Sequence, residues 1–310
     1  MIRKAASCAA NNLMLTASLS TGQALLNLTY VLLLHISLLF VVIAFAHLPA
    51  FSLMYLILPI ICVVHQRLVS EWIHEASHFN LYNDKKINDF LSDLLLGFIF
   101  ATPIKSYRVN HLKHHITKDY FSNEDIELRV LHFESGKSLC IALIKDLLCL
   151  NALNMFIRSK NYGKELGLEV AKLILLVRKY RVVILSQTTL LVLVVLSNQL
   201  PLLCIYYFTL LSIYPMVNRI RTYGQHVCLF APRGFCLAGS QVSRTIFASR
   251  IEQVLICSPV IMFHHEHHLY PSLPYRTLRK IAVHSGDPNK HCNSNFEVVW
   301  RMLRDIKWRA

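Results

Sequence analysis

The run ALLNLTYVLLLHISLLFVVIAFA, residues 24–46, is apolar along nearly its whole length and contains no charged residue. About 20 residues of helix cross the hydrocarbon core of a bilayer, so this run predicts a transmembrane helix. The short turn 47–50, His-Leu-Pro-Ala, separates it from a second apolar run, 51–66. The two runs together predict a helical hairpin in a membrane.

A second hairpin is predicted by the uncharged block 182–218, which is interrupted at 197–201 by Ser-Asn-Gln-Leu-Pro. Its expected spans are 181–197 and 201–217. Composition agrees, because 54% of the residues are hydrophobic and only 16% are charged, against about 25% in a soluble domain. The expected fold is therefore an all-α integral membrane protein with four spans in two hairpins and a cytoplasmic helical cap.

The basic residues decide the predicted orientation. The chain has 32 Lys and Arg against 18 Asp and Glu, a net charge of +14, yet neither short turn carries a Lys or Arg. The positive-inside rule then places both termini and all other polar segments in the cytoplasm. No nucleic-acid-binding motif accompanies the positive charge, so we expect no nucleic acid partner. With no retention signal or fused domain, a bacterial inner membrane is favoured over the endoplasmic reticulum.

We expect three parts: a polar lead, 1–23; the membrane domain, 24–275; and a basic cytoplasmic segment, 276–310. Within the domain, the apolar stretch 87–104 is short and flanked by charges, which favours an in-plane or re-entrant helix over a span. Residues 138–157 have a similar character, and 163–180 resemble an amphipathic helix. The nine cysteines include no C-x-x-C pair, which argues against an iron–sulfur cluster or zinc ribbon.

Histidines form three clusters with helical spacing. Residues three or four apart lie on one face of a helix, and neutral imidazole is the commonest protein ligand for metals. Eight such imidazoles exceed the needs of one four-coordinate zinc but suit two metal ions with open positions. The clusters comprise His74 and His78; His111, His114 and His115; and His264, His267 and His268.

His226 is a ninth candidate ligand, because it follows the fourth span closely and so lies on the same membrane face. His265 lies off the shared face of its cluster and is expected behind the ligands or on the surface. Glu75 and Glu266 either orient imidazoles by accepting their second N–H or remain solvated. The other histidines lack spacing partners and are expected to be structural or exposed: His35, His47, His65, His132, His284 and His291.

The three clusters, in this order around two hairpins, resemble the histidine boxes of the integral-membrane fatty acid desaturase family. The tail His-His-Leu-Tyr-Pro, 267–271, is especially similar. The resemblance extends from about the first span to Tyr275. His226 matches the additional ligand that the family has after its fourth span. Thr222 stands where the family pattern has Asn, so a water ligand held by that Asn is not expected.

The resemblance implies a membrane-bound, O2-dependent oxidoreductase that introduces a double bond into a fatty acyl chain or lipid taken from the bilayer. Hydroxylases and carotenoid ketolases share the boxes and stay open as alternatives. No His-Pro-Gly-Gly haem motif is present, which implies a separate electron donor of ferredoxin or cytochrome type. The implied cofactor is two iron ions held by His74, His78, His111, His114, His115, His226, His264, His267 and His268.

Two other functional classes compete with this interpretation. His74-Glu75-Ala76-Ser77-His78 matches the zinc metalloprotease signature, in which two histidines bind zinc and the glutamate acts as base. Such a protease needs a third ligand, often an Asp near a later span, and the block 182–218 offers none. A divalent-metal transporter would place ionisable residues within its spans, where this chain has only His35 near mid-depth.

Overall fold

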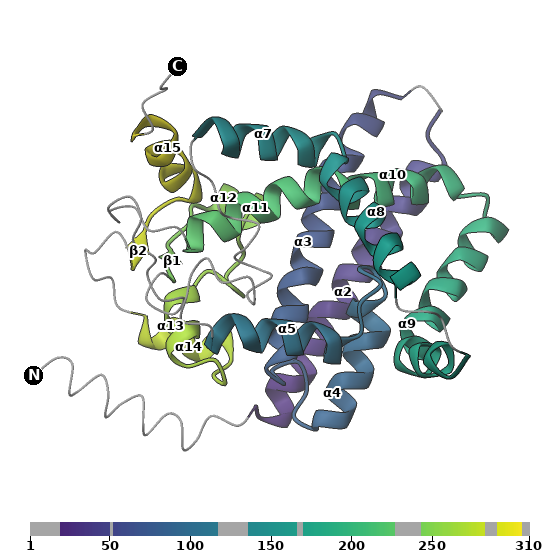
Figure 1. The fold of residues 1–310 in the computed structure, drawn as a ribbon, viewed down its shortest axis with the longest axis horizontal. Helices are drawn as coiled ribbons and strands as arrows, with labels where there is room; N and C mark the ends of the chain where they lie inside the picture. Colours follow the sequence, from purple (N-terminus) through teal and green to yellow (C-terminus); the bar gives the residue numbers. More distant parts are fainter. Residues whose placement is uncertain are drawn as a thin grey trace, which may run out of the picture.

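The computed structural model describes residues 19–49, 52–116, 136–165, 170–226, 243–282 and 290–305 (Figure 1). Within these ranges the elements are helices, apart from two strands of two residues each. Four helical stretches are long and apolar enough to cross a membrane: Thr21–Ala46, Leu53–Ser77, Ile174–Leu196 and Leu200–His226. The predicted all-helical, multi-pass membrane fold is confirmed.

The first hairpin consists of α2 (Thr21–Ala46) and α3 (Leu58–Ser77), with the 3-10 turn η1 (Leu53–Leu56) between them. A capping box begins α2: the Ser20 hydroxyl accepts the Gln23 backbone N–H, and the Gln23 side chain accepts the Ser20 N–H. These bonds satisfy donors that a helix N-terminus leaves unpaired. A proline in the first turn of α3 starts that helix without losing an internal hydrogen bond.

The helices of the spans extend further than the apolar runs. The predicted end at 66 is passed by α3, which continues to Ser77. In the second hairpin, α9 (Val170–Leu196) begins before the predicted 181 and takes in the second half of 163–180. The fourth span consists of α10 (Leu200–Leu211) and α11 (Ile213–His226), which passes the predicted 217. Hydropathy locates the bilayer, whereas a helix ends only where its backbone hydrogen bonds end.

No helix long enough to span occurs in the stretch 87–104, which was predicted to be in-plane or re-entrant. It contains α4 (Lys85–Ser92), then the π-helical turn η2 (Asp93–Gly97), and reverses before α5 (Ile104–Ile116). The Asp93 carboxylate accepts the N–H of Ile104 at 2.6 Å. This bond satisfies a donor at the N-terminus of α5, where a negative charge is also favoured by the helix dipole.

Substitution of Gly97 by alanine is expected to destabilise this reversal. A Cβ at Gly97 would lie 2.6 Å from the backbone oxygen of Thr102, an atom that cannot move aside as a side chain can. Overpacking of this kind costs about 1–3 kcal/mol. The measurement is the thermal melting temperature of the purified protein in detergent. Gly22→Ala is the matched control, because nothing lies within 4 Å of its added Cβ; equal melting temperatures for the two variants would contradict the prediction.

A sharp bend divides the predicted helix 138–157. The helices α7 (Gly136–Leu147) and α8 (Leu150–Glu165) meet at 79°, as a broken span or a re-entrant loop would. Asp146 at the bend is buried and forms an ion pair with Arg219 of α11, with Nε and Oδ2 2.5 Å apart. Asn151 donates a further hydrogen bond to the same carboxylate. The charge inside this apolar stretch is thus paired with another helix.

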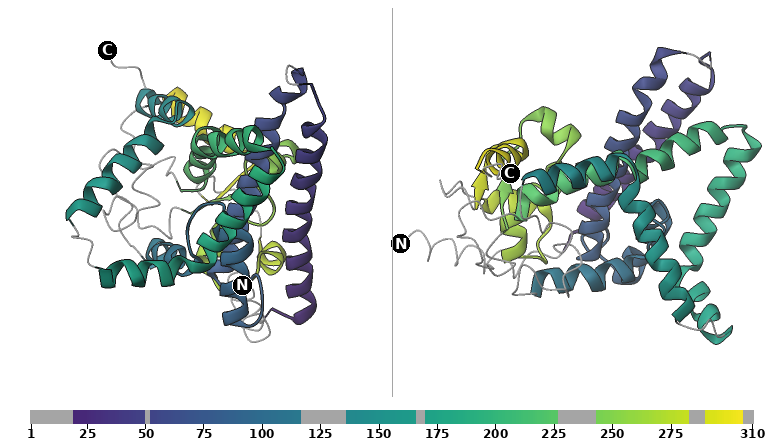
Figure 2. Two further views of the ribbon diagram at one scale, coloured as in Figure 1. Left: turned by 90° about the vertical axis from the view of Figure 1, so that its right-hand side faces the viewer. Right: turned by 45° about the horizontal axis from the view of Figure 1, so that its top comes forward.

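The cap contains α12 (Arg250–Leu255), α13 (His264–Leu269), α14 (Tyr275–Ile281) and α15 (Asn295–Asp305). The strands β1 (Thr245–Ile246) and β2 (His291–Cys292) pair in parallel beside them. The right-hand view of Figure 2 shows the cap gathered on one side. The turn between α2 and α3 and the turn between α9 and α10 lie away from it. Its apolar core includes Cys257, Ile261 and Phe263 and reaches Val63 of α3 and Val217 of α11. The cap is therefore packed against α3 and α11, which belong to two of the spans.

Candidate metal centre

Four separate elements carry the nine predicted ligands. His74 lies in the last turn of α3 and His78 follows directly after that helix. The second cluster lies on α5, and the third lies on the short helix α13. His226 is the last residue of α11. Because α3, α5 and α11 meet α13 of the cap, residues up to about 190 positions apart in sequence become neighbours.

The nine imidazoles form two groups, and in each group one nitrogen from every ring lies within 4.8 Å of the others. Neighbours in sequence separate: His114 and His115 enter different groups, and so do His267 and His268. Consecutive residues on a helix point about 100° apart, so one helix serves both groups. The five-imidazole group contains His74, His78, His111, His115 and His267, and the four-imidazole group contains His114, His226, His264 and His268.

Hydrogen bonding alone does not account for the four-imidazole group. The Nε2 atom of His264 lies 2.7 Å from that of His226 and 3.1 Å from that of His268. The Nε2 of His268 is also 3.2 Å from that of His114. A neutral imidazole nitrogen carries either one proton or one lone pair. It can therefore form one such hydrogen bond with good geometry, but not two. A cation accepting all the lone pairs satisfies every contact.

The five-imidazole group has the same pattern. The Nε2 of His111 lies 3.0 Å from those of both His78 and His115, and the Nε2 of His115 is 3.1 Å from that of His267. Both ring nitrogens of His74 are buried without a hydrogen-bond partner. Metal–nitrogen bonds of about 2.0–2.1 Å put neighbouring ligands at right angles about 3 Å apart. Both groups are therefore able to bind a metal ion.

Burial keeps the imidazoles in the form that binds metals. All four members of the second group are buried, as are three of the first, with His78 and His115 half-buried. Burial, and then the neighbouring imidazoles, hold the pKa values of His264, His267 and His268 well below 6.5. These rings are neutral at pH 7, and metal binding requires the neutral form.

A model of the fatty acid desaturase family matches residues 50–293, well over half of the chain and including all nine histidines. The chain belongs to the fatty acid desaturase family. No curated protein is similar enough to the chain to count as a match. The predicted family is confirmed, and this desaturase-family protein is an oxidoreductase of a di-iron family rather than a zinc protease or a metal transporter.

Behind the rings of this desaturase-family protein, Glu266 anchors α13 to the strand pair. Its carboxylate accepts hydrogen bonds from the Thr245 hydroxyl and from Nε2 of His291, the latter at 3.1 Å. Burial by itself would raise the pKa of Glu266, but the bonds from His291 and Thr245 outweigh it and lower that pKa. Glu266 is thus buried and bonded rather than solvated. His265 points elsewhere, with Nδ1 3.1 Å from the Ser243 carbonyl oxygen.

His291, which was expected to be structural or exposed, is buried. It pairs with Glu266, which directly precedes the ligand candidate His267, and it lies on β2 opposite Thr245. An isolated histidine 25 residues from its partner has no spacing signal, so nothing in the local pattern pointed to it. The segment 276–310 thereby contributes His291 and α15 to the same cap.

Glu75 has a partner other than an imidazole. Its Oε2 accepts the backbone N–H of Tyr275 at 3.2 Å, which ties α3 to the start of α14. Its Oε1 lies 3.7 Å from Nδ1 of His74, too far for a hydrogen bond. Glu75 is therefore close to the imidazole that it was expected to orient but does not hold it.

Two further histidines link the spans. The Nδ1 of His65 lies 2.9 Å from the Tyr206 hydroxyl, and its Nε2 lies 3.2 Å from Nδ1 of His35. The His35 Nε2 in turn lies 2.8 Å from the Leu95 carbonyl oxygen. The chain of contacts joins α2, α3, α10 and η2, in keeping with a structural role. His47 is exposed at the first turn, and the predictions for His132 and His284 lie outside the described residues.

Thr222, which replaces the Asn of the family pattern, is engaged within α11. Its hydroxyl donates to the carbonyl oxygen of Asn218 at 2.8 Å. This is the usual local bond of a threonine inside a helix.

Proposed function

We propose that this protein is a membrane-bound, O2-dependent desaturase that introduces a double bond into a fatty acyl chain. The nine imidazoles hold two irons, one in each group. The observation that carries the proposal is the contact between two buried groups of imidazoles. The ring of His115, in the first group, lies 4.5 Å from the ring of His268, in the second, so the two positions are adjacent.

When bound, a reduced pair of irons supplies activation of dioxygen and an oxidant for unactivated C–H bonds. Desaturation removes one hydrogen from each of two neighbouring CH2 groups. The reduction of O2 to two waters takes those two hydrogens together with two more electrons and two protons. The buried histidines exclude water from the reacting centre. The extra electrons come from a separate ferredoxin- or cytochrome-type donor, and the basic surface would attract an acidic partner.

The proposed topology follows from charge. Both termini and the imidazoles face the cytoplasm, as the positive-inside rule requires, and a bacterial inner membrane is the favoured location. The ligand-bearing helices α3 and α11 are continuous with the second and fourth spans. A substrate held in the bilayer can therefore approach the centre along these helices without leaving the membrane. The domain limits 24–275 remain part of this proposal.

Lipid mass spectrometry of a heterologous host, with and without the gene, tests the reaction. We expect host acyl chains lighter by two hydrogen atoms, in amounts that require oxygen during growth. Derivatisation of the new double bond then gives its position. Acyl chains heavier by one oxygen atom would instead identify a hydroxylase, and a product formed without oxygen would contradict both reactions.

A further inference from the structure

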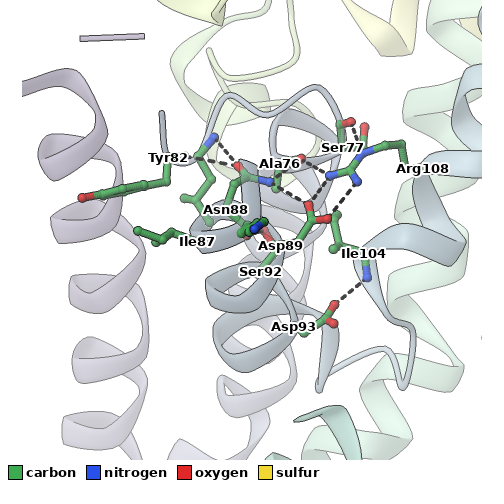
Figure 3. A network of polar contacts seen from close by, with 12 residues as sticks. Ala76, Ser77, Tyr82, Ile87, Asn88, Asp89, Ser92, Asp93, Ile104 and Arg108 are labelled. Atoms are coloured by element: carbon green, nitrogen blue, oxygen red, sulfur yellow. Dashed lines mark hydrogen bonds and ion pairs between the residues drawn. The ribbon is translucent and has the colours of Figure 1, made fainter. Parts of the chain in front are cut away.

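The C-terminal end of α3 is held by a side chain from α5. A helix leaves its last carbonyl groups without internal partners, and in α3 these groups lie between His74 and His78. Arg108 donates from Nε to the Ser77 oxygen at 2.7 Å and from Nη2 to the Ala76 oxygen at 3.2 Å. Figure 3 shows the guanidinium of Arg108 directed at the end of α3.

Arg108 is itself held in place. Its Nη2 lies 2.6 Å from Oδ1 of Asp89 and its Nη1 lies 3.2 Å from Oδ2, so the two side chains form a bidentate ion pair. The two side chains are only 12% and 15% exposed. The guanidinium also stacks on the ring of Phe79, 3.8 Å from its centroid. A planar fork with fixed donors is pre-organised for this set of partners.

Asn88 completes the network from α4. Its side-chain amide donates to the Ala76 oxygen at 3.0 Å, and its Oδ1 accepts the N–H groups of Leu81 and Tyr82. Figure 3 shows these bonds beside the ion pair. Three helices, α3, α4 and α5, therefore meet at the turn that follows His78.

The helices that this network joins contribute unequally to the two groups of imidazoles. Arg108 lies three residues before His111, about one helical turn, and His111 and His78 have their Nε2 atoms 3.0 Å apart. Four of the five imidazoles in the first group come from α3 and its end or from α5. In the second group α3 provides none and α5 provides His114 alone. A shift between α3 and α5 therefore disturbs mainly the first group.

We propose that Arg108, held by Asp89, is a positioning residue for the five-imidazole group and that it determines whether this group retains its metal. The inference rests on the proposed pair of irons. Arg108 acts through the backbone of α3, by setting the distance between the end of that helix and α5. Lysine keeps the charge but has a single compact ammonium, which cannot reach two carbonyls and both carboxylate oxygens together.

The test compares Arg108→Lys with wild type in the full-length protein, purified in detergent and loaded with iron. We expect two irons per chain in the wild type and about one in the variant. Its Mössbauer spectrum should show a single kind of iron site. Asp89→Asn should also reduce the iron content. It replaces Arg108→Lys in the test if that variant fails to fold.

The matched control is Arg219→Lys. Arg219 also forms a two-pronged pair, with Asp146, at 2.5 and 3.0 Å, and it joins α11 to α7. This variant should lose thermal stability to a similar degree yet keep two irons. Two irons and an unchanged spectrum in Arg108→Lys, or an equal iron loss in Arg219→Lys, would overturn the inference. A wild-type protein without iron would overturn the proposed function itself.

Discussion

Replacement of His267 by alanine is expected to abolish the lipid product and to remove iron from the five-imidazole group. His267 is buried, its Nε2 lies 3.1 Å from that of His115, and its ring is 4.3 Å from that of His74. Alanine leaves a buried gap in place of a proposed ligand. Loss of a single outer partner of a ligand already costs 10–100-fold in affinity or activity, so loss of the ligand should reduce product to the host background.

The measurements are product formation by mass spectrometry and iron content of the purified protein. His114→Ala should have the same effect through the four-imidazole group. His47→Ala is the matched control, because His47 is exposed at the turn of the first hairpin, remote from both groups; it should keep wild-type product and iron. Full activity in both His267→Ala and His114→Ala would refute the assignment of these histidines as ligands.

The second large effect is expected from Glu71→Ala, which leaves the guanidinium of Arg67 buried without its carboxylate. The two side chains of this ion pair are 2% and 0% exposed, with Nη1 and Oε1 2.5 Å apart. Breaking a buried pair by removing one partner costs about 3–5 kcal/mol. With an unfolding entropy of about 2.1 cal/mol/K per residue, 1 kcal/mol corresponds to about 1.5 °C for a chain of 310 residues. The melting temperature should therefore fall by about 5–8 °C.

This pair also connects α3 to the cap. Arg67 donates to the Val254 oxygen at 2.7 Å, and Glu71 accepts the backbone N–H of Ser258 at 3.1 Å. The segment that follows leads directly into α13. Thermal melting in detergent is the measurement, and the double variant Arg67→Met/Glu71→Leu is the control. Because it removes both charges, it should recover much of the loss. A melting temperature unchanged in Glu71→Ala would contradict the prediction.

The spans and the histidine boxes could be predicted from sequence because both depend on neighbours along one helix. A nearly uninterrupted apolar run is sufficient to identify α2 as a span, since about 20 such residues cross the bilayer. The spacing of His111, His114 and His115 places their imidazoles along one side of a helix whatever that helix packs against. Membership of the desaturase family rests on the same local patterns.

The partners across the fold could not be predicted, because contacts between distant segments leave no period in the sequence. Glu71 and Ser258 illustrate this, because they are hydrogen-bonded although they lie 187 positions apart in the sequence. His291 had no pattern at all, yet it holds the carboxylate between two box histidines. The positions where α3 and α11 end were likewise not predictable. Both helices continue beyond their apolar runs, where the rest of the protein packs against them.

The sequence by itself determined four spans, three boxes and the nine imidazoles, since hydropathy and helical spacing are properties of adjacent residues. Only the tertiary structure decided how those imidazoles divide. His114 and His115 stand side by side in sequence but face different groups, because the angle between them on α5 directs one ring towards α11 and the other towards α3. The packing of α3, α5, α11 and α13 therefore produces two adjacent sites from three boxes.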